Sequence, residues 1–146
     1  MHITLSVIGK LKDPALKTLY EEYKKRLDWK IAVNEFETKG SPRQESDLLL
    51  NSLPPSSFLI TLDEKGENLK SEEFATLLND IQIHHQGKVV FVIGGASGLT
   101  EDIKSKAQKS LSFGRMTWPH LLVRVMFMEQ IYRAQQILKG HPYHRE

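Results

Sequence analysis

The fold of this chain is decided by the stretch VVFVIGGASGL, residues 89–99. Its first five residues form an apolar run without polar alternation, which is typical of a parallel strand covered on both faces. The glycines that follow are Gly94, Gly95 and Gly98. Ligands bind beyond the carboxyl ends of strands in open α/β sheets, and glycines let backbone N–H groups approach a ligand closely. The stretch therefore predicts a buried strand followed by a ligand-binding loop.

Apolar periodicity on both sides of this stretch predicts that strands and helices alternate along the chain. Strands are expected near 2–8, 31–37, 57–62, 88–93 and 111–116, and helices near 14–27, 43–53, 71–85, 100–110 and 120–138. Helix start signals stand at Asp13-Pro14, at Ser71 with two following glutamates, and at Thr100. The pattern predicts a single α/β domain over residues 1–146, with an open, mostly parallel sheet and helices on both faces.

The amino-acid composition excludes several kinds of catalytic and metal-binding site. The 146 residues include no cysteine, which excludes disulfides, thiolate metal sites and cysteine nucleophiles and suits a reducing cytoplasm. The apolar run at residues 3–8 is too short for a signal peptide, and no uncharged span approaches membrane length. We therefore expect a soluble, cytoplasmic protein without a membrane partner.

The net charge of +2 is unevenly distributed. Residues 10–30 carry seven basic and four acidic side chains, residues 111–146 carry five and two, and residues 31–110 carry eight and twelve. If the two basic ends meet in space, they form a positive patch of the kind that attracts phosphate backbones. Scattered, solvated lysines are the alternative explanation.

Three connections follow predicted strands and can converge on one crevice: residues 62–66, 94–98 and 113–119. The last is bracketed by Gly114 and Pro119, which favours an irregular segment with exposed backbone polar groups that could read an adenine edge. An ordinary strand-to-helix turn explains the same residues.

The helix expected near 120–138 has more apolar residues than one stripe facing a sheet requires. Packing against both its own sheet and a second subunit explains this composition, so we expect a homodimer. Arg124 within the apolar stretch needs an anionic partner: either a structural salt bridge or a substrate phosphate. Glu129 and Arg133 are spaced to support the helix as an i,i+4 pair.

The final segment, residues 140–146, is rich in histidine, tyrosine and arginine. Chain ends are usually disordered, but these side chains are suited to stacking on a base, neutralising phosphate and moving a proton near neutral pH. His141 and His144 have no third ligand spaced with them, so no metal site is predicted.

Common nucleotide and hydrolase motifs do not fit. The glycine loop does not match G-x-G-x-x-G and follows the fourth predicted strand, and no GK[ST] phosphate loop occurs. Neither a Ser-His-Asp triad nor a carboxylate pair has a recognisable local signature.

The combined motifs resemble the family of ribosomal RNA large subunit methyltransferase H, of the SPOUT class. The resemblance spans the whole chain and rests on Val7-Ile8-Gly9-Lys10, Thr61-Leu62-Asp63, Ile93-Gly94-Gly95, Leu111-Ser112-Phe113, Met116-Thr117-Trp118-Pro119-His120, Val123-Arg124-Val125, Glu129-Gln130-Ile131-Tyr132-Arg133-Ala134 and His141-Pro142-Tyr143-His144-Arg145-Glu146. It implies a trefoil knot at the carboxyl end, S-adenosylmethionine as cofactor, a homodimer, and N3-methylation of a pseudouridine in the 23S ribosomal RNA of an assembled ribosome.

Residue roles follow from the same resemblance. The cofactor-binding positions are Leu62, Gly94, Gly95, Gly98, Phe113, Gly114, Arg115, Met116, Thr117 and Trp118. The catalytic roles follow from the chemistry instead: the acceptor nitrogen must lose a proton, so His144 is the candidate proton acceptor, with Arg145, Arg124 and Arg133 as candidate anion or phosphate partners. RNA contacts are expected from Lys10, Lys12, Tyr143, His144 and Arg145.

Two other functions remain open at this point. A non-catalytic nucleotide-binding module would use the glycine loop for a nucleotide and the basic ends for a protein or RNA partner. A metal-dependent hydrolase would use the terminal histidines, although their spacing does not favour it.

Overall fold

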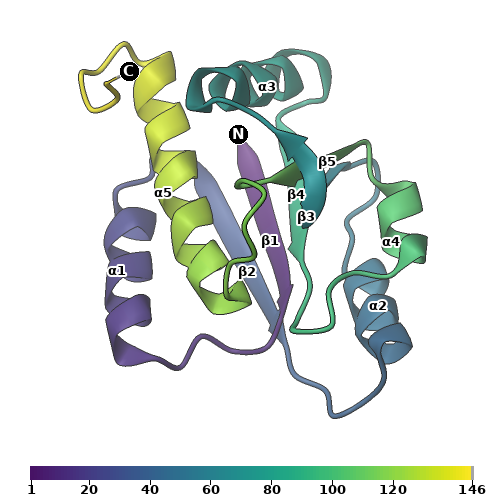
Figure 1. Cartoon of the computed structure of the whole chain (residues 1–146). Helices are drawn as coiled ribbons and strands as arrows, with labels where there is room; N and C mark the ends of the chain where they lie inside the picture. The colour runs from purple at the N-terminus through teal and green to yellow at the C-terminus, as the bar shows by residue number, and fades with distance from the viewer. Residues whose placement is uncertain (146) are drawn as a thin grey trace.

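Five parallel strands form one sheet of order β2-β1-β4-β3-β5 in a computed structural model that describes residues 1–145 (Figure 1). The strands are β1 (His2–Ile8), β2 (Lys30–Phe36), β3 (Phe58–Asn68), β4 (Lys88–Ile93) and β5 (Lys109–Ser112). The helices are α1 (Pro14–Lys25), α2 (Pro42–Asn51), α3 (Ser71–His84), α4 (Glu101–Lys106) and α5 (His120–Leu138). The predicted parallel α/β class is confirmed. Glu146, the last residue of the quoted tail motif, lies outside the described residues.

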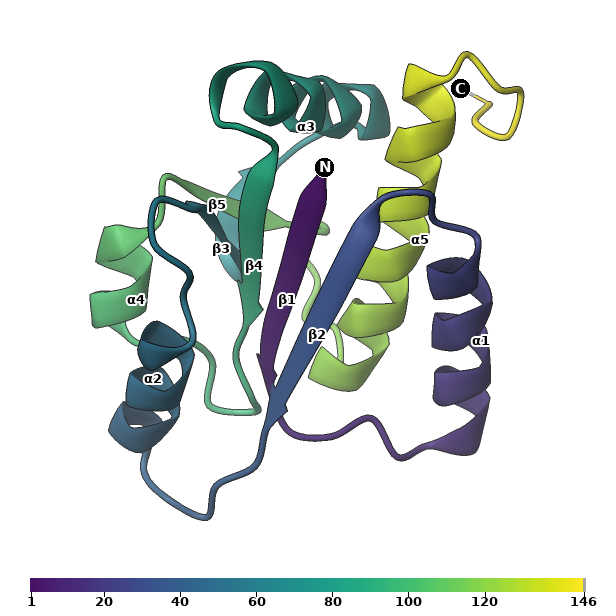
Figure 2. The same cartoon turned by 180° about the vertical axis from the view of Figure 1, so that it is seen from behind.

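Helices cover both faces of the sheet, as predicted. Helices α1, α3 and α5 pack on one face, and α2 and α4 lie on the other, which Figure 2 turns toward the viewer. Strand β4 supplies Val89, Phe91 and Ile93 to the larger core and Val90 and Val92 to the smaller one. The unbroken apolar run of β4 is therefore explained by burial on two faces.

Local signals set the helix starts. The Asp13 carboxylate accepts hydrogen bonds from the backbone N–H groups of Ala15 and Leu16, and Pro14 opens α1. Such caps satisfy donors that the first helical turn leaves free. Thr100 precedes α4 as expected, but its hydroxyl makes a 2.7 Å hydrogen bond with that of Ser46 and does not cap the helix.

The boundaries predicted for β3, α4 and β5 differ from the structure. Strand β3 continues to Asn68, α4 ends at Lys106, and β5 lies at 109–112, earlier than predicted. Gln108 is the cause on the α4 side: its backbone N–H and side-chain oxygen pair with Leu59 at 2.9 and 2.7 Å, which draws the chain onto the sheet edge. These long-range bonds outweigh the local helical pattern.

The extension of β3 contains a large bulge. Leu62 and then Glu67 both pair with Leu111 of β5, so residues 63–66 are looped out between them. A Cβ on Gly66 would lie 2.5 Å from the Leu111 carbonyl carbon, so this close approach requires glycine. The bulge places Asp63 and Glu64 at the carboxyl edge of the sheet, where the glycine loop also lies.

Candidate functional site

A cavity of about 540 Å³ lies where the three predicted connections meet. Its walls come from the β3 bulge, the glycine loop after β4, and the segment from β5 into the first turn of α5. The lining residues are Leu62, Asp63, Glu64, Ile93, Gly94, Gly95, Ala96, Ser97, Gly98, Leu99, Leu111, Ser112, Phe113, Met116, Thr117, Trp118, Pro119, His120 and Val123. The structure thus brings together eight of the ten predicted cofactor-binding residues; Gly114 and Arg115 are absent from this lining.

The glycine loop is tightly folded on itself. The Gly98 N–H donates to the Gly95 carbonyl at 2.9 Å, and Gly98 has a φ of +76°, in the left-handed region that favours glycine. At Gly94, a Cβ would lie 2.6 Å from the carbonyl oxygen of Gly98. The two glycines therefore have different purposes: Gly94 permits close packing and Gly98 permits the turn.

The segment between β5 and α5 is held at both ends. Gly114 donates to the Asn68 side chain at 3.2 Å, and the Ser112 hydroxyl donates to the Gly114 carbonyl at 2.6 Å. Near α5, the Trp118 indole N–H donates to the Phe113 carbonyl at 3.2 Å, and the Thr117 hydroxyl donates to Glu64 at 3.1 Å. The last bond joins two walls of the cavity.

Apolar side chains dominate the cavity wall, with a few polar groups at defined positions. Asp63 pairs with Lys104 at 3.2 Å, whereas Glu64 is exposed at the mouth. Burial, followed by the nearby Arg124 guanidinium, lowers the pKa of His120 and so favours its neutral form. This mixture of apolar wall and few polar groups is typical of small-molecule sites.

Arg124 has the structural role that the sequence left as one alternative. It is 1% exposed, its Nη2 donates to the Ile8 carbonyl at 2.5 Å, and its Nη1 pairs with Glu35 at 3.2 Å. The same Glu35 oxygen accepts from the Leu11 N–H at 2.8 Å. Arg124 therefore ties α5 to the ends of β1 and β2 behind the cavity.

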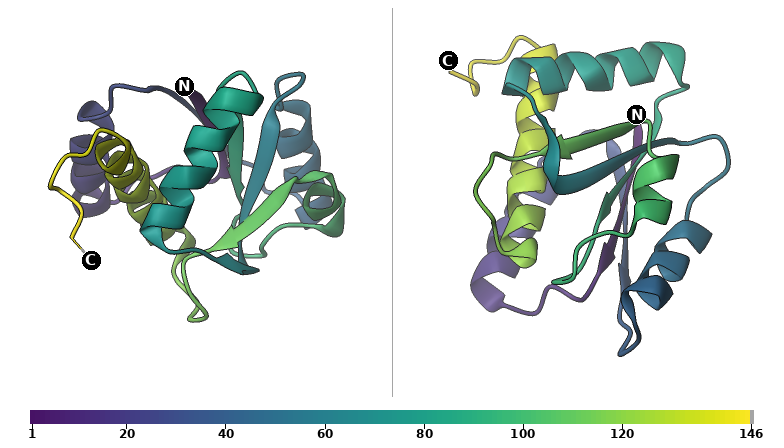
Figure 3. Two further views of the ribbon diagram at one scale, coloured as in Figure 1. Left: turned by 90° about the horizontal axis from the view of Figure 1, so that it is seen from above. Right: turned by 45° about the vertical axis from the view of Figure 1, so that its right-hand side comes forward.

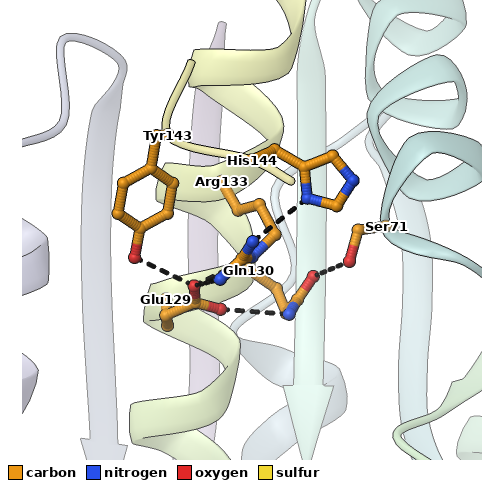
Figure 4. A network of polar contacts seen from close by, with 6 residues as sticks. All are labelled: Ser71, Glu129, Gln130, Arg133, Tyr143 and His144. Atoms are coloured by element: carbon orange, nitrogen blue, oxygen red, sulfur yellow. Dashed lines mark hydrogen bonds and ion pairs between the residues drawn. The ribbon is translucent and has the colours of Figure 1, made fainter. Parts of the chain in front are cut away.

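The carboxyl-terminal tail is ordered by a polar network on α5 and α3 (Figure 4). Glu129 accepts from Arg133 Nε and Nη2 at 2.9 and 2.5 Å and from the Tyr143 hydroxyl at 3.1 Å. Arg133 Nη1 donates to His144 Nδ1 at 3.0 Å, and His144 Nε2 lies 2.9 Å from Glu72. Because guanidinium groups only donate, Nδ1 accepts and the His144 proton sits on Nε2.

The surroundings of Arg133 and Tyr143 favour the protonated forms that donate the hydrogen bonds of this network. The hydrogen bond to Glu129 raises the pKa of Arg133, while burial and then the Glu129 charge raise the pKa of Tyr143. The Arg133 guanidinium also lies over the Tyr143 ring, 5.0 Å from its centroid. Glu129 and Arg133 do form the predicted i,i+4 pair, but that pair also holds the tail.

The cavity and the tail lie at opposite ends of α5 (Figure 1). Arg133 lies thirteen positions after His120 in the helix, which corresponds to about 20 Å at the rise of an α-helix. Lys10 and Lys12 follow β1 at the carboxyl edge of the sheet, where they pair with Glu37 at 4.0 and 3.4 Å. Within a single subunit, the predicted donor site is therefore distant from the predicted tail residues, including the exposed Arg145.

The two basic ends of the sequence do meet in space, because α1 packs against α5. Ion pairs such as Lys25–Glu22 and Lys139–Asp28 reduce the net field of that surface. Within residues 1–145, no group of three acidic or histidine side chains is placed to hold a metal ion. No helix of the described chain is long and apolar enough to cross a membrane.

Fold and cavity together define a SPOUT methyltransferase: the family model described as predicted SPOUT methyltransferase matches residues 1–144. Similar proteins of Rhodospirillum centenum (46% identical, 99% of each chain covered) and Carboxydothermus hydrogenoformans (42% identical, 99% of this chain and 100% of the relative) are both named ribosomal RNA large subunit methyltransferase H. The chain belongs to the ribosomal RNA large subunit methyltransferase H family.

Solved structures independently support the fold. A probable methylase family protein from Haemophilus influenzae superposes with a TM-score of 0.59 at 11% identity, over 99% of this chain and 70% of that one. TrmJ from Z. mobilis superposes with a TM-score of 0.52 at 8% identity, over 92% and 69%. At such low identities the likeness concerns the arrangement of helices and strands alone.

Sequence reasoning missed several residues that the structure brings into the two sites. Asp63, Glu64 and His120 line the cavity, although none was assigned a cofactor role; the first two stand in the connection 62–66 that was expected at the crevice, and His120 opens α5. Glu72 contacts the tail from α3, 72 positions before His144. No local pattern could have indicated that pairing.

Proposed function

We propose that the chain transfers a methyl group from S-adenosylmethionine to N3 of a pseudouridine in 23S ribosomal RNA, in the assembled ribosome. It would act in the cytoplasm as a homodimer of single-domain subunits. The observation that carries this proposal is the three-walled cavity built from the β3 bulge, the glycine loop and the segment before α5. The trefoil knot implied by the resemblance would involve the same late segments and stays a prediction.

The residues of the cavity fit this methyl donor. A volume of about 540 Å³ is within the range of small-molecule and cofactor pockets. Leu62, Leu99 and Phe113 offer apolar surface for a purine, and the glycines of the loop, which have no Cβ, offer close backbone contacts. The Glu64 carboxylate, unlike that of Asp63, has no paired cation among the described residues and favours a cationic ligand, and a sulfonium is one.

When bound, S-adenosylmethionine supplies an electrophilic methyl group. The contribution of this chain is to orient the donor and the acceptor base, and alignment of two reactants can lower a barrier by about 7–11 kcal/mol. The rigid walls suit this task, because the Thr117–Glu64 hydrogen bond and the packed glycine loop leave little freedom. Arg115 and Gly114 would act from just outside the lining.

The acceptor nitrogen must lose a proton, and the tail carries the candidate groups. We assign His144 as proton acceptor, with Arg133 and Arg145 as anion or phosphate partners and Tyr143 as an RNA contact. Both ring nitrogens of His144 are engaged in this conformation, by Arg133 and Glu72. The tail therefore has to leave these partners before His144 can accept a proton. Arg124 would contribute indirectly, by supporting the cavity wall.

In a dimer, the tail of the partner subunit could reach the cavity that the subunit's own tail does not reach. Since the tail of one subunit is about 20 Å along the helix from its own cavity, a tail supplied by the partner would complete each site. A groove of about 590 Å³ between α1, α3 and α5 is lined by Leu19, Leu69, Leu122 and Met126 and suits such a contact. Helices α1 and α3 of the same chain cover the flanks of α5. The apolar surface of α5 that is left for a partner subunit is therefore the part that lines this groove.

The function is tested by two measurements on the purified protein. Titration calorimetry should show binding of S-adenosylmethionine, and a labelled methyl group should pass to ribosomes from a strain that lacks the modification. Ribosomes that already carry the modification are the control and should take up no label. Absence of binding at millimolar cofactor would overturn the proposal and favour a non-catalytic nucleotide-binding module.

Supply of the tail by the partner predicts complementation between two inactive variants. Gly94→Ala impairs the cavity and His144→Ala impairs the tail, so each variant alone should be nearly inactive. Randomly mixed dimers should recover about a quarter of wild-type activity, because half are heterodimers and each has one intact composite site. Co-expression with two different affinity tags allows the heterodimer to be isolated and assayed. An inactive heterodimer would show that the tail serves its own subunit.

A further inference from the structure

The network that holds the tail includes a residue of α3, a helix from which no described residue lines the cavity. Glu72, in the first turn of α3, lies 2.9 Å from His144 Nε2 and accepts its N–H. The preceding residue, Ser71, donates to the Gln130 side chain of α5 at 2.8 Å. Figure 3 shows the start of α3 beside α5 in both views. Glu72 therefore contacts the tail from an element that is attached to α5 independently of the tail.

We propose that Glu72 is a latch that keeps the tail in a resting position on its own subunit, and that opening of this latch limits methyl transfer. The inference rests on the proposed function, in which His144 is the proton acceptor, and adds to it a residue that restrains this acceptor. His144 Nδ1 accepts from Arg133 while Nε2–H donates to Glu72. Neither nitrogen can take a proton from the acceptor base while the tail is held.

The tail is held at two separate points. On the α5 side, the Tyr143 hydroxyl donates to Glu129, and the Tyr143 ring packs against that of Tyr132 with centroids 4.8 Å apart. On the α3 side, Glu72 holds His144, and the Glu72 side chain is 39% exposed. Water can replace a partner at such an exposed edge. The contact with Glu72 can therefore open without any change in the packing of α5 and α3.

The charges around the tail indicate what opens the latch. The carboxylates of Glu72 and Glu129 hold the tail residues in the resting position. Phosphate groups repel these two carboxylates and attract Arg133 and the exposed Arg145. A bound RNA strand therefore competes with the acidic partners of the tail. His144 is released where the polyanionic substrate is present, and it stays held elsewhere.

Removal of Glu72 should release the tail in RNA-free protein. Carboxypeptidase Y digests a chain from its carboxyl end, so the rate at which it passes His144, followed by mass spectrometry, reports how often the tail is released. Glu72→Ala should raise this rate about 3- to 10-fold, as for loss of one partly exposed hydrogen bond. Glu72→Gln keeps an acceptor oxygen without the charge and should have a smaller effect. Asp80→Ala is the matched control, because Asp80 is exposed on the same helix and its replacement changes the net charge equally.

The same substitution should accelerate the reaction. In single-turnover methylation of ribosomes that lack the modification, Glu72→Ala should be about 3- to 10-fold faster than wild type, and Asp80→Ala should be unchanged. The affinity for S-adenosylmethionine, measured by calorimetry, should be the same in all variants, since Glu72 and Asp80 are outside the cavity lining. Removal of a residue that only stabilised α3 would not increase the rate.

Three results would overturn the latch. They are digestion of Glu72→Ala at the wild-type rate, faster digestion without faster methylation, and slower methylation, which would mean that Glu72 positions His144 for the reaction. A different result separates the latch from the proposed function. If Glu72→Ala is digested faster but the wild-type protein binds no S-adenosylmethionine, Glu72 holds the tail as proposed and the methyltransferase function fails.

Discussion

Gly94→Ala should reduce methyl transfer about 100-fold, the scale expected when reacting groups are misplaced by 1 Å. The added Cβ would lie 2.6 Å from the Gly98 carbonyl oxygen and 2.7 Å from its carbonyl carbon. Neither is the end of a flexible side chain, so the glycine loop itself must move. Calorimetry with S-adenosylmethionine and single-turnover methylation of ribosomes would measure the effect on binding and on transfer.

Gly98→Asn is the matched control for this prediction. A Cβ on Gly98 meets no atom within 4 Å, and the cost comes from its φ of +76°. This left-handed conformation costs about 1–2 kcal/mol for a residue with a side chain, and less for asparagine. Gly98→Asn should therefore bind the cofactor almost as wild type does. Equal losses in Gly94→Ala and Gly98→Asn would show that close packing at Gly94 is not the critical feature.

Arg124→Ala should lower the free energy of unfolding by about 3–5 kcal/mol, as expected when a large buried side chain and its hydrogen bonds are removed together. The substitution removes one of the largest fully buried side chains and leaves the Ile8 carbonyl without its 2.5 Å donor. Chemical denaturation followed by circular dichroism would measure the loss. Arg124→Lys should recover only part of it, because an ammonium cannot reproduce the fork between Ile8 and Glu35.

Glu35→Gln is the corresponding control on the other side of the pair. Its amide oxygen can still accept from the Leu11 N–H, and the side chain of Glu35 is 35% exposed, so water can compensate. Because Arg124 is 1% exposed and loses its counter-ion, we expect a loss of about 1–3 kcal/mol, smaller than for Arg124→Ala since the amide oxygen can still accept both hydrogen bonds. If Arg124→Ala were as stable as wild type yet inactive, the structural role would be wrong and a direct contact with substrate would be favoured.

The sequence predicted most of the fold because the responsible signals are local. The run before Gly94 is typical of a strand buried on both faces, and Asp13-Pro14 marked a helix start by hydrogen bonding within one turn. The prediction was wrong about the ends of β3, α4 and β5. Those ends depend on Gln108 pairing with Leu59 and on Gly66 packing against Leu111, which are contacts between distant parts of the chain.

The candidate site divides in the same way. Three connections could be expected to converge because parallel strands end at one edge, and the structure does bring residues 62–64, 94–99, 111–113 and 116–120 around one cavity. The contribution of Asp63 and Glu64 depends on a bulge that has no periodic signature. The tail could be recognised by its composition, but its attachment to Glu72 and Glu129 could not.

The amino-acid sequence by itself determined the α/β class, the glycine loop after β4 and the side chains available for chemistry, since these follow from residue type and short-range spacing. Only the tertiary structure decided that Arg124 supports the fold, that the tail is held about 20 Å along α5 from the cavity, and that Trp118 is exposed at its mouth. The reason is physical: burial and pairing depend on which distant segments meet, and this is settled by packing of the whole chain.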